Sequence, residues 1–140
     1  MSRPAPGRIL IIEDEPSLLW LMEQYLSRLG YQVDGFLAAG PALERFDSDP
    51  AAYALLIADV SLPEISAPGV LPSLLERNPA LRVLVCTGSS FALASLPEPL
   101  RRRVGYLQKP FAPQMLAAAI QRLLEASDQP PTAAGEASAG

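Results

Sequence analysis

The sequence predicts an α/β fold in which five parallel strands form one doubly wound sheet of order 2-1-3-4-5. Three observations support this prediction. Apolar runs without alternation, such as 9–12 and 54–58, are typical of strands that are covered on both faces. Each strand candidate is followed by a candidate helix, and this βα unit occurs five times. The length of 140 residues suits one domain with a single core.

The first unit begins with the strand Arg8–Ile12, which ends in the acidic triplet 13–15. Pro16 fits the first position of the following helix, where a missing N–H costs nothing. Leu19 and Trp20 fall outside the expected core stripe, so we expect this helix to offer them as apolar surface for partner docking. The stripe itself is expected to contain Leu18, Leu21, Met22, Tyr25, Leu26 and Leu29.

The second unit has a more exposed strand. Residues 31–36 alternate in polarity as an edge strand does, and a short helix follows from Gly40-Pro41. The third strand, 53–58, is apolar throughout and runs directly into Asp59. Taken alone, an aspartate at a strand end is more often a turn cap than part of a site. Its position still matters, because open α/β sheets bind ligands at the carboxyl ends of their strands.

The remaining units are shorter and richer in proline. A loop over 63–69 leads to a helix from Val70 with Pro72 in its first turn, since a proline further in would break the helix. The fourth strand, 81–86, is again buried, and a short helix is expected from residue 89. Pro97 and Pro99 are expected to end that helix, whose apolar residues are Phe91, Leu93 and Leu96. The last strand is 104–107, and the last helix, from Pro113, is expected to bury Met115, Leu116, Ala119, Ile120, Leu123 and Leu124.

The domain is expected to span residues 8–126, between a flexible lead at 1–7 and a tail at 127–140. The tail, rich in Pro, Ala, Gly and Ser, has too little to bury and is expected to be disordered. No apolar run is long enough to cross a bilayer, and no secretory signal precedes the domain. The sequence therefore predicts a cytoplasmic protein.

Composition excludes several kinds of function. The net charge of −4 argues against general binding to nucleic acid, and the basic triplet 101–103 is more typical of a solvated face. The absence of histidine excludes a Ser-His-Asp hydrolase, a His-ligated metal site and a phosphohistidine on this chain. Cys86 lies in an apolar run and is expected to be a small buried side chain in a reducing compartment.

Polar residues gather at the predicted carboxyl edge of the sheet. Glu13 and Asp14 follow the first strand and Asp59 the third, so three carboxylates would crowd one cleft. Carboxylate oxygens with retained waters suit Mg²⁺. Thr87 and Lys109, after the fourth and fifth strands, add a hydroxyl and an amine. Such a set is a plausible cradle for a phosphoryl group on a carboxylate.

Four segments carry a resemblance that covers residues 8–126. In order along the chain they are Ile11-Ile12-Glu13-Asp14-Glu15-Pro16, Asp59-Val60-Ser61-Leu62-Pro63, Val85-Cys86-Thr87-Gly88 and Tyr106-Leu107-Gln108-Lys109-Pro110-Phe111. Together they resemble the motifs of response-regulator receiver domains of two-component signalling, which have the flavodoxin-like fold of CheY. Glu13 stands where many receivers have aspartate, and Pro97 and Pro99 shorten the fourth helix.

The resemblance implies a phosphoacceptor and not an enzyme, with at most self-phosphorylation and self-dephosphorylation. Asp59 would take a phosphoryl group from a histidine kinase or a histidine phosphotransfer protein, and signalling would pass to an unidentified downstream protein. The resemblance also implies Mg²⁺, with Mn²⁺ as a possible substitute, held by Asp14, Asp59 and the Ser61 backbone carbonyl, with Glu13 acting mainly through water. Lys109 would pair with Asp59 and then with the phosphoryl group, Thr87 would hydrogen-bond it, and Tyr106 would change rotamer as the readout.

The length of the chain favours a stand-alone receiver that acts through protein contacts, without nucleic acid or membrane. Three alternatives remain open. The chain is also compatible with the C-terminal receiver of a hybrid histidine kinase, or with an interaction module that works without phosphorylation. A small phosphatase with an aspartyl nucleophile is disfavoured, because such enzymes place a second acid where this chain has Ser61.

Overall fold

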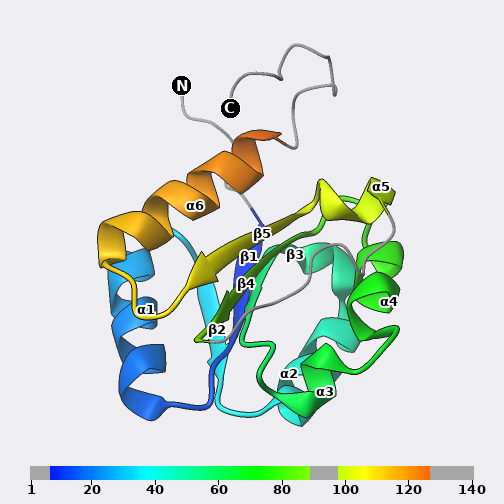
Figure 1. Cartoon of the computed structure of the whole chain (residues 1–140), viewed down its shortest axis with the longest axis horizontal. Coiled ribbons are helices and arrows are strands. Elements are labelled where there is room, and N and C mark those ends of the chain that lie inside the picture. The colour runs from blue at the N-terminus through cyan, green and yellow to red at the C-terminus, as the bar shows by residue number, and fades with distance from the viewer. Residues whose placement is uncertain (1–6, 89–97, 127–140) are drawn as a thin grey trace.

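The computed structural model describes residues 7–88 and 98–126. Within these ranges five parallel strands form one sheet of order β2-β1-β3-β4-β5 (Figure 1). This arrangement confirms the predicted fold class. The edge position expected for the second strand is confirmed as well. The strands are β1 (Arg8–Ile12), β2 (Val33–Phe36), β3 (Tyr53–Ala58), β4 (Arg82–Thr87) and β5 (Val104–Gln108).

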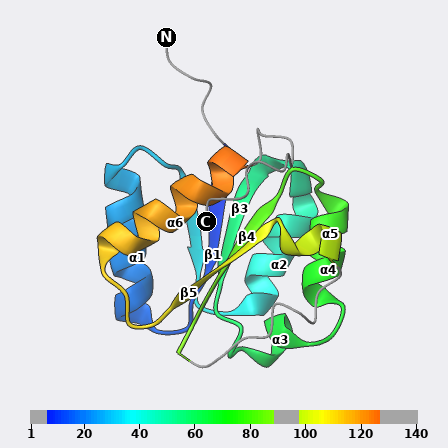
Figure 2. The same ribbon diagram turned by 45° about the horizontal axis from the view of Figure 1, so that its top comes forward.

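The helices cover both faces of the sheet. On one face α1 (Pro16–Arg28) and α6 (Pro113–Ala126) lie side by side, as both ribbon views show (Figures 1 and 2). The other described helices lie toward the opposite face, so that helices cover the sheet on both sides. They are α2 (Ala39–Ser48), α3 (Pro63–Ser66), α4 (Val70–Arg77) and α5 (Glu98–Arg101), with a short 3₁₀ turn at Pro50–Ala52.

The sheet separates two apolar cores. Alternate residues of β1 and β3 point to opposite faces, so Ile11 and Ile57 pack toward α1 and α6, whereas Leu10 and Leu56 pack toward α2 and α4. All four side chains are at most 1% exposed. Burial on both faces is the physical reason why these strands are apolar throughout instead of alternating.

The buried face of α1 differs from the expected one. Leu19, Met22 and Leu26 are buried, whereas Leu21 and Leu29 are 56% and 51% exposed. The prediction that Leu19 offers docking surface is therefore wrong. Gly35 of β2 explains the choice, because a Cβ there would lie 2.9 Å from Leu19 Cδ1, and the bare backbone lets α1 approach at this point.

Three smaller differences concern helix ends and faces. Met115 is 50% exposed, since α6 buries Leu116 and its helical neighbours instead. The loop expected after Pro63 contains the single-turn helix α3. Pro99 lies at the second position of α5, a helix that was not expected there and in whose first turn proline is tolerated. Pro72 lies in the first turn of α4, as predicted.

Arg103 departs from the solvated face expected for the basic triplet. Its guanidinium donates hydrogen bonds to the carbonyls of Leu75 (3.0 Å), Asn78 (2.7 Å) and Leu81 (3.0 Å), which belong to the last turn of α4 and the approach to β4. Arg102, in contrast, is exposed. The triplet therefore includes one arginine that ties a helix end to the sheet.

The helix expected over 89–97, with Phe91, Leu93 and Leu96, lies outside the described residues, as do positions 1–6 and the tail 127–140. The predicted boundaries of the domain thus stay predictions. Among the helices of the described part of the chain, none has the length and apolar character needed to span a membrane.

Candidate functional site

The carboxyl ends of four strands meet at one edge of the sheet, toward the bottom of Figure 1. Ile12 and Ala58 are register partners, so Glu13 and Asp59 leave neighbouring strands side by side. The backbone N–H of Asp59 donates to the carbonyl of Ile12 at 3.3 Å, which continues the β1–β3 ladder to this point. The N–H of Lys109 donates to the carbonyl of Thr87 at 2.9 Å and extends β4–β5 in the same way.

Lys109 joins the two buried carboxylates. Its Nζ lies 2.9 Å from Asp59 Oδ2 and 2.9 Å from Glu13 Oε1. Glu13 is 2% exposed and Asp59 is 4% exposed, so this ammonium neutralises charge that water reaches poorly. The structure thus brings together three of the residues that the sequence analysis placed at this edge.

Backbone N–H groups occupy the other oxygen of each carboxylate. The N–H of Ser61 donates to Asp59 Oδ1 at 2.8 Å, and the N–H of Glu15 donates to Glu13 Oε2 at 3.1 Å. In both cases the donor lies two residues after the acceptor. The tight turns after β1 and β3 therefore fix the orientation of both carboxylates.

These contacts set the ionisation of the site. Burial raises the pKa of Asp59, but the hydrogen bonds from Lys109 and Ser61 outweigh it and leave the pKa below its ordinary value. For Glu13 burial is the largest influence, and it raises the pKa despite the contact with Lys109. Burial lowers the pKa of Lys109, yet the two carboxylates raise it overall. Asp59 is therefore an ionised carboxylate beside a protonated amine at neutral pH.

Asp14 completes an acidic cluster. One oxygen each of Glu13, Asp14 and Asp59 lie within 4.8 Å of one another. Asp14 is exposed and forms no hydrogen bond or ion pair with the described part of the chain. Three carboxyl groups beside one ammonium form a set of oxygen donors that is open to water at Asp14, and such a set fits a divalent cation such as Mg²⁺. The residues present therefore fit the metal that the sequence analysis expects.

Two further residues were predicted to take part in the site, Thr87 and Tyr106. Thr87 is 0% exposed at the end of β4. Tyr106 lies on β5, the edge strand, with its side chain 36% exposed and its Cα in register with Val85. The roles expected for their side chains stay predictions.

A small pocket beside Lys109 was not anticipated. It has a volume of about 260 Å³ and lies between the start of α1 and the loop after β5. Trp20 is 58% exposed on α1, as expected. The signal for this pocket was the second apolar stripe of α1, which leaves Leu21 exposed and Leu18 only partly buried at the margin of the core. The pocket is lined by Glu15, Ser17, Leu18, Leu21, Lys109, Pro110 and Phe111.

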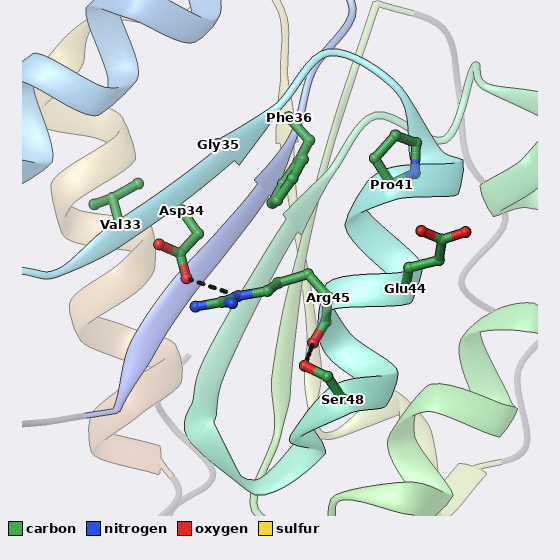
Figure 3. Close-up of a pocket in the computed structure, with 8 residues that line it drawn as sticks. All are labelled: Val33, Asp34, Gly35, Phe36, Pro41, Glu44, Arg45 and Ser48. Atoms are coloured by element: carbon green, nitrogen blue, oxygen red, sulfur yellow. Dashed lines mark hydrogen bonds and ion pairs between the residues drawn. The ribbon is translucent and has the colours of Figure 1, made fainter.

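A larger pocket, of about 660 Å³, lies apart from this site, between β2 and α2 (Figure 3). Arg45 extends from α2 toward Asp34 of β2 across its floor, with Nε 3.9 Å from Asp34 Oδ2. Phe36 and Pro41 line its opposite end in the same view. None of the residues predicted to take part in phosphoryl chemistry lines this pocket.

Comparison with known proteins gives a consistent family. The family model described as "Response regulator receiver domain" matches residues 9–121. The response regulator receiver protein CpdR of Brucella abortus is 28% identical over 120 residues, which cover 86% of this chain and 98% of CpdR. The sensor kinase CckA of the same organism is 26% identical over a match that covers 86% of this chain but 13% of the kinase.

Solved structures agree on the fold. A CheY-like response regulator receiver domain protein from Methanospirillum hungatei superposes with a TM-score of 0.74 at 24% identity, covering 89% of this chain and 98% of that one. The coverage of curated relatives varies. The chain spans 13% to 27% of the length of CckA and two NtrC regulators, but nearly all of CpdR.

Proposed function

Because the chain belongs to the family of response regulator receiver domains, we propose that Asp59 is the residue that accepts the phosphoryl group. Receiver domains are phosphoacceptors in two-component signalling. The observation that carries the proposal is the contact of Lys109 Nζ with Asp59 Oδ2 at 2.9 Å, within a cluster of three carboxylates. The pKa of Asp59 lies below its ordinary value, which favours the ionised, nucleophilic form.

The reaction transfers a phosphoryl group from nitrogen to oxygen. An oxygen of Asp59 attacks the phosphorus of a phosphohistidine on a histidine kinase or phosphotransfer protein. The P–N bond breaks, and the imidazole nitrogen keeps the electron pair and takes up a proton. Lys109 stabilises the negative charge on the transferring group, and the N–H of Ser61 keeps the Asp59 carboxylate in place.

Asp14, Asp59 and the backbone carbonyl of Ser61 would hold Mg²⁺, and Mn²⁺ suits the same oxygens. Bound there, the cation would neutralise charge on the phosphoryl oxygens. Asp14 is suited to this role because its carboxylate is exposed and has no other partner in the described residues.

Thr87 and Tyr106 would convert phosphorylation into a surface change. The new group carries about −1.5 to −2 charges at neutral pH, enough to bias a two-state surface. The Thr87 hydroxyl would donate a hydrogen bond to the phosphoryl group. Tyr106, which is 36% exposed on the edge strand β5, would then exchange its exposed rotamer for a buried one. A downstream protein would recognise this change.

The proposed phosphoryl transfer does not depend on whether the domain stands alone or belongs to a longer protein. CpdR and CckA carry the same kind of domain in proteins of different length, so relatives exist for both contexts left open by the sequence. We propose a cytoplasmic location, which suits a chain whose single cysteine, Cys86, is buried and has no second cysteine for an internal disulfide.

The test is to incubate the protein with acetyl phosphate or phosphoramidate and to weigh it intact. We expect a gain of one phosphoryl group with Mg²⁺, none after chelation, and none in Asp59→Asn. Asp49→Asn is the matched control, because this exposed aspartate precedes β3 at the opposite end of the strand. No gain with Mg²⁺ present, or an undiminished gain in Asp59→Asn, would falsify the proposal.

We also propose that the phosphoryl donor docks on α1 beside the pocket at Lys109. Trp20 and Leu21 are 58% and 56% exposed there, and Leu21 also lines the pocket that reaches Lys109. An apolar surface next to the acceptor suits a protein that must place its phosphohistidine at Asp59. This surface replaces the expected pair, because Leu19 is buried.

A kinase panel tests the docking proposal. The histidine kinase that phosphorylates the wild-type chain fastest is selected, and the rate is then measured for Trp20→Ala. We expect transfer from this kinase to fall about tenfold or more, as for an aromatic interface anchor, with phosphorylation by acetyl phosphate unchanged. Met115→Ala, which removes an apolar side chain that is 50% exposed on α6, serves as the control. Equal losses with both donors would refute docking at Trp20.

A further inference from the structure

Glu13 and Asp14 are neighbours in sequence but have opposite surroundings. Glu13 is 2% exposed, and both of its oxygens have partners, Lys109 Nζ at 2.9 Å and the N–H of Glu15 at 3.1 Å. Asp14 is exposed and has no partner in the described part of the chain. A cation arriving from solvent therefore meets a free carboxylate at Asp14 and an occupied one at Glu13.

The order of the strands determines how far the side chains of Lys109 and Glu13 must extend to meet. Lys109 follows β5 at the edge of the sheet, and its side chain must pass β4 to reach Asp59 after β3. Glu13 follows β1, one strand further away, and still lies 2.9 Å from the same ammonium. Glutamate is one methylene longer than aspartate, and this extra reach brings its carboxylate to Lys109.

We propose that Glu13 is a positioning residue that anchors the Lys109 ammonium in the site, while Asp14 and Asp59 serve as the carboxylate ligands of the metal. This inference rests on the proposed function of Asp59. When Asp59 becomes an acyl phosphate, its carboxylate no longer offers Lys109 the same partner. Glu13 still offers Lys109 a carboxylate oxygen, because the contacts of Glu13 do not involve the reacting group. The ammonium therefore has one constant counter-charge before and after transfer.

The contact of Lys109 with Glu13 can be measured selectively, because Lys109 is the only lysine of the sequence. With ¹⁵N-lysine labelling, one side-chain NH₃⁺ signal reports the exchange of its protons with water in the metal-free, unphosphorylated protein. Glu13→Asp keeps the charge and shortens the reach, and we expect exchange to become about tenfold faster, as for the loss of one charge-assisted hydrogen bond. Glu13→Gln keeps the length and removes the charge, and should also accelerate exchange. Asp14→Asn should leave the exchange rate within about twofold, because Asp14 does not contact Lys109.

Mg²⁺ binding, measured by calorimetry, separates anchoring from metal ligation. We expect Glu13→Asp to keep the Kd within about threefold, since the charge of the cluster is unchanged. Asp14→Asn should weaken binding by about tenfold or more, since it removes a ligand. A backbone ¹H–¹⁵N spectrum confirms that each variant is folded, and Glu13→Asp is decisive if Glu13→Gln fails to fold.

Two results would overturn the inference: an unchanged lysine signal in Glu13→Asp, or a loss of Mg²⁺ affinity in Glu13→Asp as large as that in Asp14→Asn. Neither measurement requires phosphorylation. A failure of Asp59 to accept a phosphoryl group would be seen in the mass experiment and leave the lysine signal as it is, so the two failures are distinguishable.

Discussion

Asp34 on β2 has three side-chain partners on the α2 face of the sheet, namely Arg8, Tyr53 and, at 3.9 Å, Arg45. Arg8 donates to both of its oxygens, at 3.0 and 3.2 Å, and Tyr53 Oη donates to Oδ2 at 2.7 Å. The hydrogen bonds with Arg8 lower the pKa of Asp34 more than burial raises it. The network ties the starts of β1 and β3 to the edge strand β2.

A depressed carboxyl pKa gives a pH-dependent contribution to stability. It is fully present above the unfolded pKa, near 3.8, and is lost as the pH falls through the lower folded value. We expect Asp34→Asn to lower the free energy of unfolding by about 1–3 kcal/mol near neutral pH, because the substitution removes the hydrogen bonds to a charged carboxylate. Urea titrations at about pH 7 and about pH 3 should show the difference shrinking at the lower pH. Asp49, which is exposed, has no such partners in the described part of the chain, so Asp49→Asn should change little at either pH. A pH-independent effect of Asp34→Asn would contradict the assignment.

At the scale of elements, Arg103 fastens the end of α4 to the sheet. The last carbonyls of a helix lack intrahelical partners. The guanidinium of Arg103 donates hydrogen bonds to the carbonyls of Leu75 and Asn78 at that end, and also to the carbonyl of Leu81. Asn78 assists from the other side, because its Nδ2 donates to the carbonyls of Pro50 (2.8 Å) and Tyr53 (2.7 Å). Both side chains satisfy backbone groups that the segment between α4 and β4 would otherwise bury without partners.

Replacing Arg103 should therefore destabilise the domain although its charge is kept. Lysine has one compact ammonium and cannot reproduce a fork that reaches three carbonyls. We expect Arg103→Lys to reduce the free energy of unfolding by about 1–3 kcal/mol, with no change in the slope of the urea transition. Arg102→Lys, one residue away and exposed, should stay within about 0.5 kcal/mol. Equal effects of the two substitutions would show that the carbonyl contacts contribute nothing.

At the scale of the whole molecule, the acidic cluster couples metal binding to stability. The metal-free site carries three carboxylates against one ammonium, so repulsion opposes folding until a cation binds. A ligand that binds only the folded state stabilises it by about 2.7 kcal/mol at a hundredfold excess over its Kd.

Thermal unfolding should show this coupling. At such an excess of Mg²⁺ we expect Tm to rise by roughly 10 °C, and sodium chloride at equal ionic strength should not reproduce the shift. Asp14→Asn should raise Tm without metal, because it removes repulsion, and should lose most of the increase with Mg²⁺. A Mg²⁺ shift that is undiminished in Asp14→Asn would place the cation elsewhere.

Much of the molecule was predictable from local patterns. The apolar runs of β1 and β3 have no alternation, and that is possible in a stable sheet only when helices cover both faces. Once the strands are parallel, Glu13, Asp59, Thr87 and Lys109 must come to one edge, because every strand ends on the same side. Spacing in the sequence thus determined which residues could form the site.

Tertiary packing decided the rest. The residues of α1 contain two overlapping apolar stripes with the same helical period, and the packing of α1 on the sheet, with its close approach to Gly35, buries Leu19 and leaves Leu21 exposed. The bridge from Lys109 to Glu13 joins the residues that directly follow β1 and β5, and no local pattern links these two segments. Arg103 appears in sequence as one of three arginines, and only the neighbouring end of α4 distinguishes it. Periodicity is a property of one segment, whereas these contacts depend on which segments the fold places together.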